Sequence, residues 1–125
     1  MPYLLKTEPD AYSIGDLERD GETVWDGVSN PQAVNILAGM KRGEMTVIYH
    51  TGTERSSVGI AKVVSVDATD GKNPVVRLKF VRRTKTPRSL AEIKAETIFS
   101  GSPLLKQGRL SVVPLTEKQY AWLAT

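Results

Sequence analysis

The sequence predicts an α+β fold, a small barrel of short, mostly antiparallel strands with helices packed around it. Apolar and polar side chains alternate over residues 45–50 and 75–81, which is the pattern of a half-buried strand. Helix-start signals occur early and late in the chain, without the strict strand–helix alternation of a doubly wound parallel sheet. The length of 125 residues predicts one domain over 1–125, large enough to bury a core without disulfides.

The first elements are expected to be a strand over 2–6 and a short helix. Ser13, with Asp16 three residues later, matches a capping box, in which each side chain accepts a hydrogen bond from the backbone N–H of the other residue. Gly21 is suited to end this helix, because glycine readily adopts the left-handed conformation that follows many helices.

The next helix is expected over 31–40. Asn30 is suited to cap it, and Pro31 suits the first helical position, where the missing backbone N–H has no helical partner to lose. Its apolar residues recur at helical spacing and are expected to face the core. They are Ala33, Ile36, Leu37 and Met40.

Strands are expected through the middle of the chain. The strand over 45–50 is followed by segment 58–66, which is rich in β-branched residues and largely apolar, as is typical of a central strand. Residues 67–74 contain an Asp-Gly pair suited to a tight turn, so we expect them to join segment 58–66 to the strand over 75–81 in a hairpin.

The last part of the chain is expected to hold two helices and one strand. Ser89 and Thr116 each stand three residues before a Glu or Gln, so both match a capping box that opens a short helix. Between them, residues 101–108 have the composition of a loop, and residues 109–113 are typical of a last strand that ends at a proline.

The composition excludes several classes of site. There is no cysteine and only one histidine, so disulfides, thiolate metal sites and histidine-rich metal sites are ruled out. No apolar run approaches the roughly 18 residues of a membrane span, and the N-terminus does not resemble a signal peptide. We therefore expect a soluble protein of the cytoplasm, or of the nucleus in a eukaryote, with no metal, cofactor or membrane partner.

The known catalytic motifs are absent as well. The chain contains no Walker-type phosphate loop, no G-x-S-x-G elbow and no H-E-x-x-H pair. A Ser-His-Asp triad would have to use His50, the single histidine. Because His50 ends an expected strand, it has two interpretations: a half-buried histidine bonded to backbone, or a hydrogen-bond donor in a pocket wall.

The segment 25–30 is the most informative feature for function. Trp25, Asp26 and Asn30 surround a glycine in a polar loop, and this loop leads directly into the helix expected at Pro31. Trp25 either packs on the core or forms a platform for a flat ligand. We favour the platform, because no apolar periodicity surrounds Trp25 and because a planar base needs an aromatic face and a few aimed polar groups.

Basic residues are concentrated in one place. The formal net charge is +3, with a pI of about 9.3, which permits a polyanionic partner. Five cationic residues stand within ten positions: Lys79, Arg82, Arg83, Lys85 and Arg88. This cluster is either a solvated strand end or a rim that contacts phosphates.

Several short segments, in order along nearly the whole chain, match one known family. They are Tyr3–Pro9, Tyr12–Ser13, Trp25–Asn30, Gln32–Asn35, Met40–Glu44, Ile48–Thr51, Val58–Ala61 and Arg109–Val112 with Pro114. Together they resemble the EVE domain, which belongs to the PUA-like group with the YTH, ASCH and SRA-type domains. The resemblance implies a twisted PUA-like pseudo-β-barrel with flanking helices. It also implies a pocket where the end of the first strand, the segment 25–30 and the Tyr49–His50 strand meet.

The residues and the resemblance together lead to a hypothesis: the chain is a module that reads a modified cytosine or adenine in DNA or RNA, and it is not an enzyme. Trp25 is expected to stack the base. The base edge is expected to meet Thr7, Asp26 and Asn30, with backbone groups near Lys6, and the opposite wall is expected to hold Tyr49 and His50. The candidate phosphate contacts are Lys6, Arg82, Arg83, Lys85 and Arg109.

Two other functions remain open. The same pocket could belong to a small enzyme that acts on a nucleoside or nucleotide, with His50 or Asp26 as the base. Alternatively, the chain could bind another protein through its basic face. A base reader should lose binding in Trp25→Ala, and an enzyme should lose rate in His50→Ala while it still binds. A protein-interaction module should respond only to charge reversal at Arg82 and Arg83.

Overall fold

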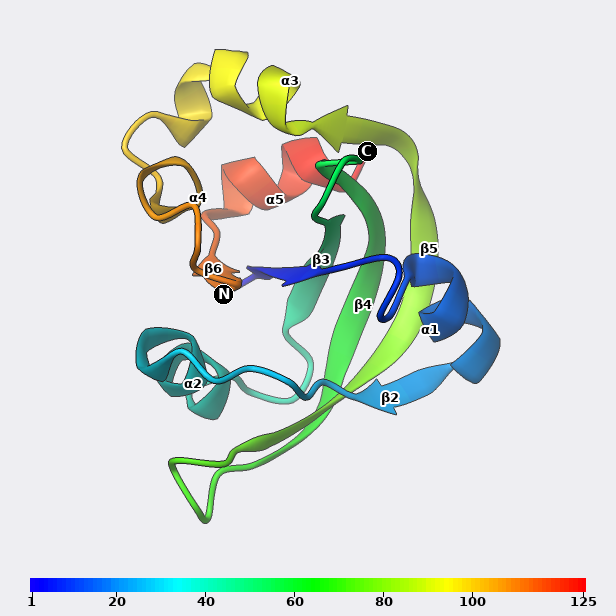
Figure 1. Cartoon of the computed structure of the whole chain (residues 1–125), viewed down its shortest axis with the longest axis vertical. Helices are drawn as coiled ribbons and strands as arrows, with labels where there is room; N and C mark the ends of the chain where they lie inside the picture. The colour runs from blue at the N-terminus through cyan, green and yellow to red at the C-terminus, as the bar shows by residue number, and fades with distance from the viewer.

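The computed structural model describes residues 1–125, and its centre is one six-stranded sheet (Figure 1). The strands lie in the order β2-β5-β4-β3-β1-β6. They are β1 (Tyr3–Thr7), β2 (Glu22–Val24), β3 (Met45–His50), β4 (Ser56–Asp67), β5 (Val75–Ser89) and β6 (Val112–Pro114). Only β1 and β3 are parallel, and every other neighbouring pair is antiparallel. The predicted mostly antiparallel α+β fold is therefore confirmed.

The sheet is strongly curved but does not close into a complete barrel. In Figure 1, β1 runs across the long strands β4 and β5 at a steep angle. Shifts of register along β3, β4 and β5 permit this curvature, because β-bulges bend strands and increase their twist. The end strands β2 and β6 each pair with one neighbour and not with each other. An open seam therefore remains between β2 and β6.

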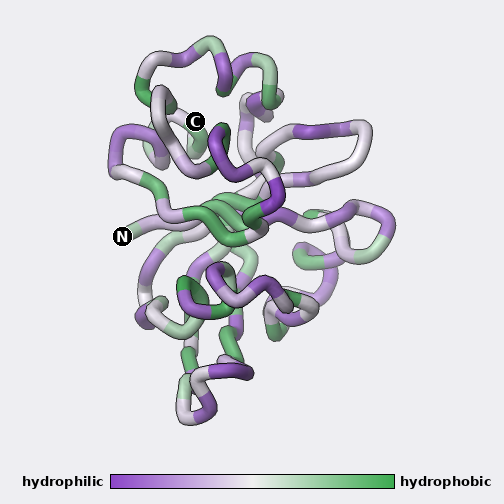
Figure 2. Tube along the Cα trace, turned by 60° about the vertical axis from the view of Figure 1, so that its left-hand side comes forward, coloured by the Kyte–Doolittle hydropathy of each residue, from purple (hydrophilic) through white to green (hydrophobic).

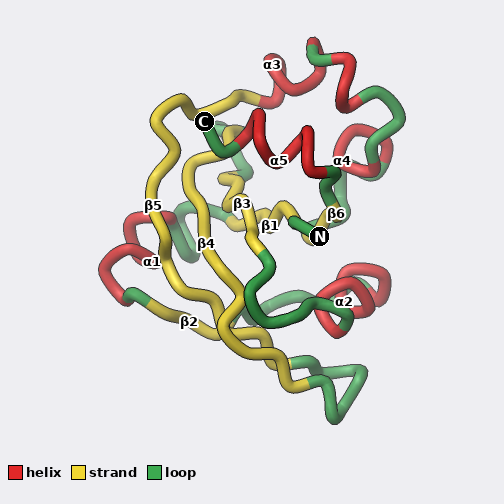
Figure 3. Tube along the Cα trace, turned by 180° about the vertical axis from the view of Figure 1, so that it is seen from behind, coloured by secondary structure: helices red, strands yellow, loops and turns green.

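Short helices surround the sheet. They are α1 (Ile14–Asp20), α2 (Pro31–Ala38), α3 (Leu90–Ala95), the 3₁₀ helix η1 (Thr97–Phe99), α4 (Pro103–Lys106) and α5 (Glu117–Leu123). Figure 3 shows α3, α4 and α5 grouped at one end of the sheet, with α2 nearer the β4–β5 hairpin. All three predicted capping boxes are present, at Ser13, Ser89 and Thr116.

The core lies between the inner face of the sheet and these helices. In Figure 2 the hydrophobic parts of the trace gather in the middle of the molecule. Strand β3 contributes from both of its faces, because every residue from Thr46 to His50 is buried. The Thr46 hydroxyl is satisfied there by donating to the carbonyl oxygen of Ala61 at 3.0 Å, as a buried polar group requires.

Three parts of the fold differ from the sequence prediction. Strand β5 does not end at residue 81 but continues to Ser89, so the whole basic cluster lies within this strand. The three-residue strand β2 and the four-residue helix α4 were not predicted. The last strand is shifted to Val112–Pro114, and Pro114 lies inside it. Proline is tolerated there because β6 is an edge strand.

Candidate functional site

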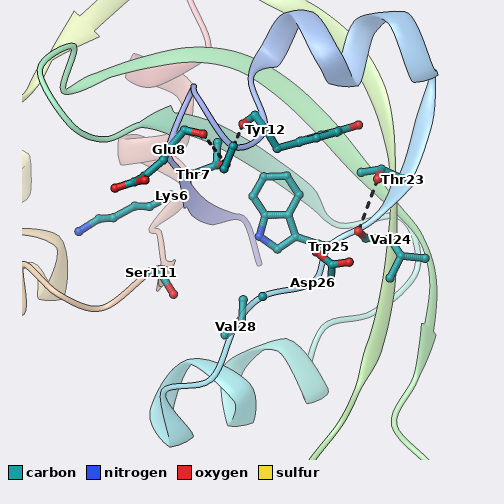
Figure 4. Close-up of a pocket in the computed structure, with 12 residues that line it drawn as sticks. Lys6, Thr7, Glu8, Tyr12, Thr23, Val24, Trp25, Asp26, Val28 and Ser111 are labelled. Carbon is teal, nitrogen blue, oxygen red and sulfur yellow. Dashed lines mark hydrogen bonds between the residues drawn. The ribbon is translucent and has the colours of Figure 1, made fainter.

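A pocket of about 490 Å³ opens at the seam of the sheet (Figure 4). One side is the end of β1 and the loop that joins it to α1, and the other side is the end of β2 with the segment 25–28. The lining residues are Lys6, Thr7, Glu8, Ala11, Tyr12, Thr23, Val24, Trp25, Asp26, Gly27, Val28 and Ser111. The volume lies within the range of about 300–1,000 Å³ that is typical of small-molecule sites.

Trp25 belongs to the core and to the pocket wall at once. Its backbone N–H donates to the carbonyl oxygen of Val76 at 2.8 Å, which continues the pairing of β2 with β5. Its indole meets the Tyr12 ring edge to face, with centroids 6.3 Å apart and planes at 82°. Only 7% of Trp25 is exposed, so the indole is not the free platform that its polar neighbours predicted. Figure 4 shows its ring nitrogen on the side of Lys6 and Ser111.

Asp26 and Gly27 turn the chain at the pocket mouth. Gly27 has a φ of +78°, a conformation that residues with a side chain rarely adopt. Asp26 is exposed, and its side chain shares the pocket lining with the exposed carboxylate of Glu8. Two hydrogen-bond acceptors are therefore available to a ligand that presents N–H groups.

The end of β1 supplies the opposite wall. The Thr7 hydroxyl donates to the carbonyl oxygen of Tyr12 at 2.7 Å, which fixes the β1–α1 loop against the strand. The Lys6 ammonium donates to the carbonyl oxygen of Gly108 at 2.9 Å and has no carboxylate partner. Burial lowers the pKa of Lys6 from its ordinary value.

The structure brings together four of the predicted ligand residues, namely Lys6, Thr7, Trp25 and Asp26. The other three lie elsewhere. Asn30 caps α2, where its side-chain oxygen accepts from the backbone N–H groups of Gln32 and Ala33. Tyr49 lines a separate pocket, and His50 is buried beneath α1. Adjacent residues of a strand point to opposite faces, so Tyr49 and His50 do not share one wall.

Both ring nitrogens of His50 already have partners. Nε2 accepts a hydrogen bond from the backbone N–H of Ile14 at 3.0 Å, and Nδ1 lies 2.6 Å from Oε2 of Glu54. His50 is 5% exposed and is not among the residues that line the Trp25 pocket. His50 is therefore not placed to act as the base of the enzyme hypothesis, whose other candidate base, Asp26, does line the pocket.

The predicted phosphate residues do not form one surface. Arg82 donates to the carbonyl oxygen of Ala124, whereas Arg83 pairs with Glu18 of α1 at 3.0 Å. Lys85 is exposed on β5, and Arg109 lines a separate depression near the N-terminus of α2. None of these four cations lines the pocket beside Trp25.

Sequence reasoning missed several residues of the pocket wall. Glu8, Tyr12, Val28 and Ser111 line it without having been predicted as site residues. All four fall within segments that resemble the EVE domain, and this was the available signal. No group of three or more His, Cys, Asp or Glu side chains is placed to hold a metal ion. None of the helices combines the length and the apolar character that crossing a membrane requires.

Known proteins share the sequence pattern and the fold of this chain. The chain is 34% identical to thymocyte nuclear protein 1 of Gallus gallus, over 94% of this chain and 65% of that protein. It therefore spans less than two thirds of that relative's length. Among solved structures, it is 30% identical to a protein from Agrobacterium tumefaciens, with a TM-score of 0.91 and coverage of 98% and 90% of the two chains.

A second solved structure is human THYN1 in complex with DNA that contains 5-methylcytosine. It is 30% identical to this chain, with a TM-score of 0.84, and the match covers 98% of this chain and 95% of that one. The family model of the EVE domain matches residues 2–125. This chain therefore belongs to the EVE domain family, as its sequence motifs predicted.

Proposed function

We propose that this chain binds DNA and holds a modified cytosine in the pocket beside Trp25. The observation that carries the proposal is the combination of an indole in the pocket wall, two carboxylates and a cation around one recess of about 490 Å³. The relative whose structure contains 5-methylcytosine DNA supports the choice of base.

The chemistry of the lining suits the edge of cytosine. The exocyclic amino group of cytosine is a donor, and carboxylates such as those of Asp26 and Glu8 are its usual acceptors in proteins. The indole N–H of Trp25, on the side of Lys6, can donate to a ring nitrogen or a carbonyl oxygen of the base. Thymine presents an oxygen where cytosine has its amino group, so the same carboxylates reject it.

The 5-methyl group contributes less than the polar edge. Burial of one methyl carbon is worth about 0.8 kcal/mol, so discrimination by methylation rests on how closely Val24, Val28 and Trp25 enclose the base. The pocket lies between the ends of two strands, and a pocket that encloses a single base cannot take it while it is stacked within a duplex. The base therefore binds unpaired or flipped out of the helix, at a cost of a few kcal/mol that the pocket contacts must offset.

The phosphate contacts are a separate part of the proposal. Arg82, Arg83, Lys85 and Arg109 stay candidates for the sequence-independent attraction of DNA. Because they lie outside the pocket, charge removal at these residues should lower affinity equally for modified and unmodified DNA. Substitutions in the pocket should instead change the preference between bases.

Fluorescence of Trp25 tests the proposal. The Trp122→Phe variant leaves Trp25 as the single tryptophan, because the chain has two. We would titrate it with single- and double-stranded DNA and RNA that carry cytosine, 5-methylcytosine, 5-hydroxymethylcytosine or N6-methyladenine. Saturable quenching by DNA with a modified cytosine is the expected result, and no quenching by any of the oligonucleotides would refute the proposal.

Two further readouts separate the alternatives. The mass of the bound oligonucleotide, measured after incubation, stays constant for a reader and changes for an enzyme. Quenching by RNA alone, or by N6-methyladenine alone, would move the assignment to that ligand. Binding of a labelled 5-methylcytosine oligonucleotide to Asp26→Ala, measured by fluorescence anisotropy, then shows whether the base edge is read in this pocket.

A further inference from the structure

A second pocket adjoins the first and has the opposite charge character. It has a volume of about 340 Å³, and its polar lining comes from Lys6, Tyr49, Thr51 and Arg55. Lys6 lines both pockets, so the two recesses meet at the end of β1. The first pocket carries two carboxylates, whereas no acidic side chain lines the second.

The two cations of the second pocket are not neutralised within the chain. The Lys6 ammonium is bonded to a backbone carbonyl oxygen, that of Gly108. Arg55 uses only its Nε, which donates to the carbonyl oxygen of Gly52 at 3.1 Å, so its two terminal nitrogens are available. The nearby carboxylate of Glu54 is bonded to Nδ1 of His50 and is not part of the lining.

Tyr49 adds a hydroxyl group to this pocket. Strand pairing sets Tyr49 beside Lys6, because β1 and β3 are neighbours in parallel register. Burial raises the pKa of Tyr49, and the nearby Arg55 guanidinium acts in the opposite direction. Tyr49 therefore remains a neutral hydrogen-bond donor at neutral pH, close to the arginine.

Arg55 is held in an unusual backbone conformation. Its φ is +46°, and it is the one residue other than glycine with a positive φ in the chain. The hydrogen bond from the N–H of Leu90 to its carbonyl oxygen, at 2.8 Å, connects this conformation to the start of α3. Such strain persists where the surrounding structure imposes it, and it is concentrated at ligand sites.

We propose that the second pocket binds a phosphate group, with Arg55 and Lys6 as charged contacts and the Tyr49 hydroxyl as a neutral donor. The inference rests on the function proposed above, because the phosphate is the one next to the nucleotide whose base lies beside Trp25. Arginine and lysine form their strongest hydrogen bonds with such anions. Burial lowers the pKa of Lys6, and a bound phosphate would give its ammonium group an anionic partner. The base then binds in the pocket with carboxylates, and the neighbouring phosphate of the DNA backbone binds in the pocket with cations.

The salt dependence of DNA binding tests the proposal. Arg55→Gln and Arg42→Gln remove the same charge, but Arg42 is exposed on the turn before β3 and lines neither pocket. With a 5-methylcytosine oligonucleotide, we expect Arg55→Gln to weaken binding and to reduce the slope of log K against log salt by about 1. Arg42→Gln should leave the slope unchanged. An unchanged slope in Arg55→Gln, with Trp25 still quenched by the oligonucleotide, would overturn the phosphate site.

A titration with inorganic phosphate makes the test independent of the base. The amide signals of Gly52 and Gly108, both in the second pocket, should shift in the NMR spectrum of the wild type and stay in place in Arg55→Gln. If no oligonucleotide quenches Trp25 but these signals shift, the base-reading function fails and the phosphate site stands. If phosphate moves neither signal, the phosphate site fails whatever the base result.

Discussion

Nε2 of His50 accepts a hydrogen bond from the backbone N–H of Ile14, the first residue of α1, at 3.0 Å. This N–H is one of the donors at a helix start that has no partner within the helix. Because Nε2 is the acceptor, the ring proton of the neutral imidazole is on Nδ1, which faces Glu54 at 2.6 Å. One buried side chain thus ties the end of β3 to the helix behind the wall of the Trp25 pocket.

We therefore expect substitution of His50 to lower the stability of the fold, and not to remove a contact to the ligand. His50→Ala leaves the Ile14 N–H without its partner in a buried position, and we expect a loss of about 1–3 kcal/mol in the free energy of unfolding. His50→Gln, which retains an acceptor oxygen, should lose less. Urea denaturation measures both variants. Full stability of His50→Ala together with lost ligand binding would show that the imidazole contacts the ligand.

Gly59 permits α1 to lie close to the sheet. A Cβ at this position would overlap Cδ1 of Ile14 and lie 2.7 Å from its Cγ1. We expect Gly59→Ala to destabilise the fold by about 1–3 kcal/mol, as overpacked cores do. In Gly59→Ala/Ile14→Ala the overlapping atoms are gone, so the two losses should be less than additive in a double-mutant cycle measured by urea denaturation. Strict additivity would show that the two residues are not in contact.

Gly27 controls the shape of the pocket mouth. Its φ of +78° is unfavourable for alanine by about 1–2 kcal/mol, so Gly27→Ala should shift Asp26 and Val28 and weaken the binding of a 5-methylcytosine oligonucleotide. Gly71→Ala is the matched control, because Gly71 has ordinary backbone angles and no neighbouring atoms within 4 Å of the added carbon. Fluorescence anisotropy measures both. Equal affinity of the two variants would contradict a role for the turn.

Asp16 should make the start of α1 sensitive to acid. The backbone N–H of Ser13 donates to its carboxylate and lowers its pKa below the ordinary value, and Arg19 acts in the same direction. Because the folded pKa lies below that of the unfolded chain, this stabilisation is full above about pH 4 and is lost as the pH falls through the folded value. The advantage of the wild type over Asp16→Asn in urea midpoint should therefore shrink in acid. A constant difference from pH 7 to pH 3 would contradict this linkage.

Local signals predicted the helix starts because a capping box involves residues only three positions apart. Ser13, Ser89 and Thr116 all carry one. The extent of β5 could not be predicted in the same way. Beyond Phe80 the strand is exposed on most positions, so the apolar alternation that marks a half-buried strand disappears while the pairing with β4 continues.

The residues of the candidate site could be predicted where they are adjacent in one loop. They could not be predicted where distant parts of the chain bring them together. Trp25 and Asp26 are adjacent in sequence and both line the pocket. The contribution of Tyr12 depends on where α1 docks, which is set by distant contacts at His50 and Gly59. For the same reason, the sequence alone did not show that His50 faces α1 rather than the Trp25 pocket.

The carboxylate of Asp26 should determine the preference between cytosine and thymine, because a base in this pocket presents its edge to that group. 5-Methylcytosine and thymine carry the same methyl group. They differ at C4, where the amino group of 5-methylcytosine donates to a carboxylate and the oxygen of thymine repels it. The wild type should favour the 5-methylcytosine oligonucleotide over its thymine counterpart by about 5- to 150-fold, the range of one well-placed base contact. Asp26→Asn can turn its amide to donate instead, so this ratio should fall mainly through tighter binding of thymine.

Glu8→Gln is the matched comparison, since Glu8 is the other carboxylate that could accept from the base and the substitution removes the same charge. A loss of overall charge would change the affinity of both variants for all DNA, whereas a base contact changes the ratio in one of them. Anisotropy titrations with oligonucleotides that differ only at the central base measure this ratio directly. If Glu8→Gln alone relaxes it, the contact to the amino group belongs to Glu8. If neither variant changes the ratio, neither pocket carboxylate reads the base edge.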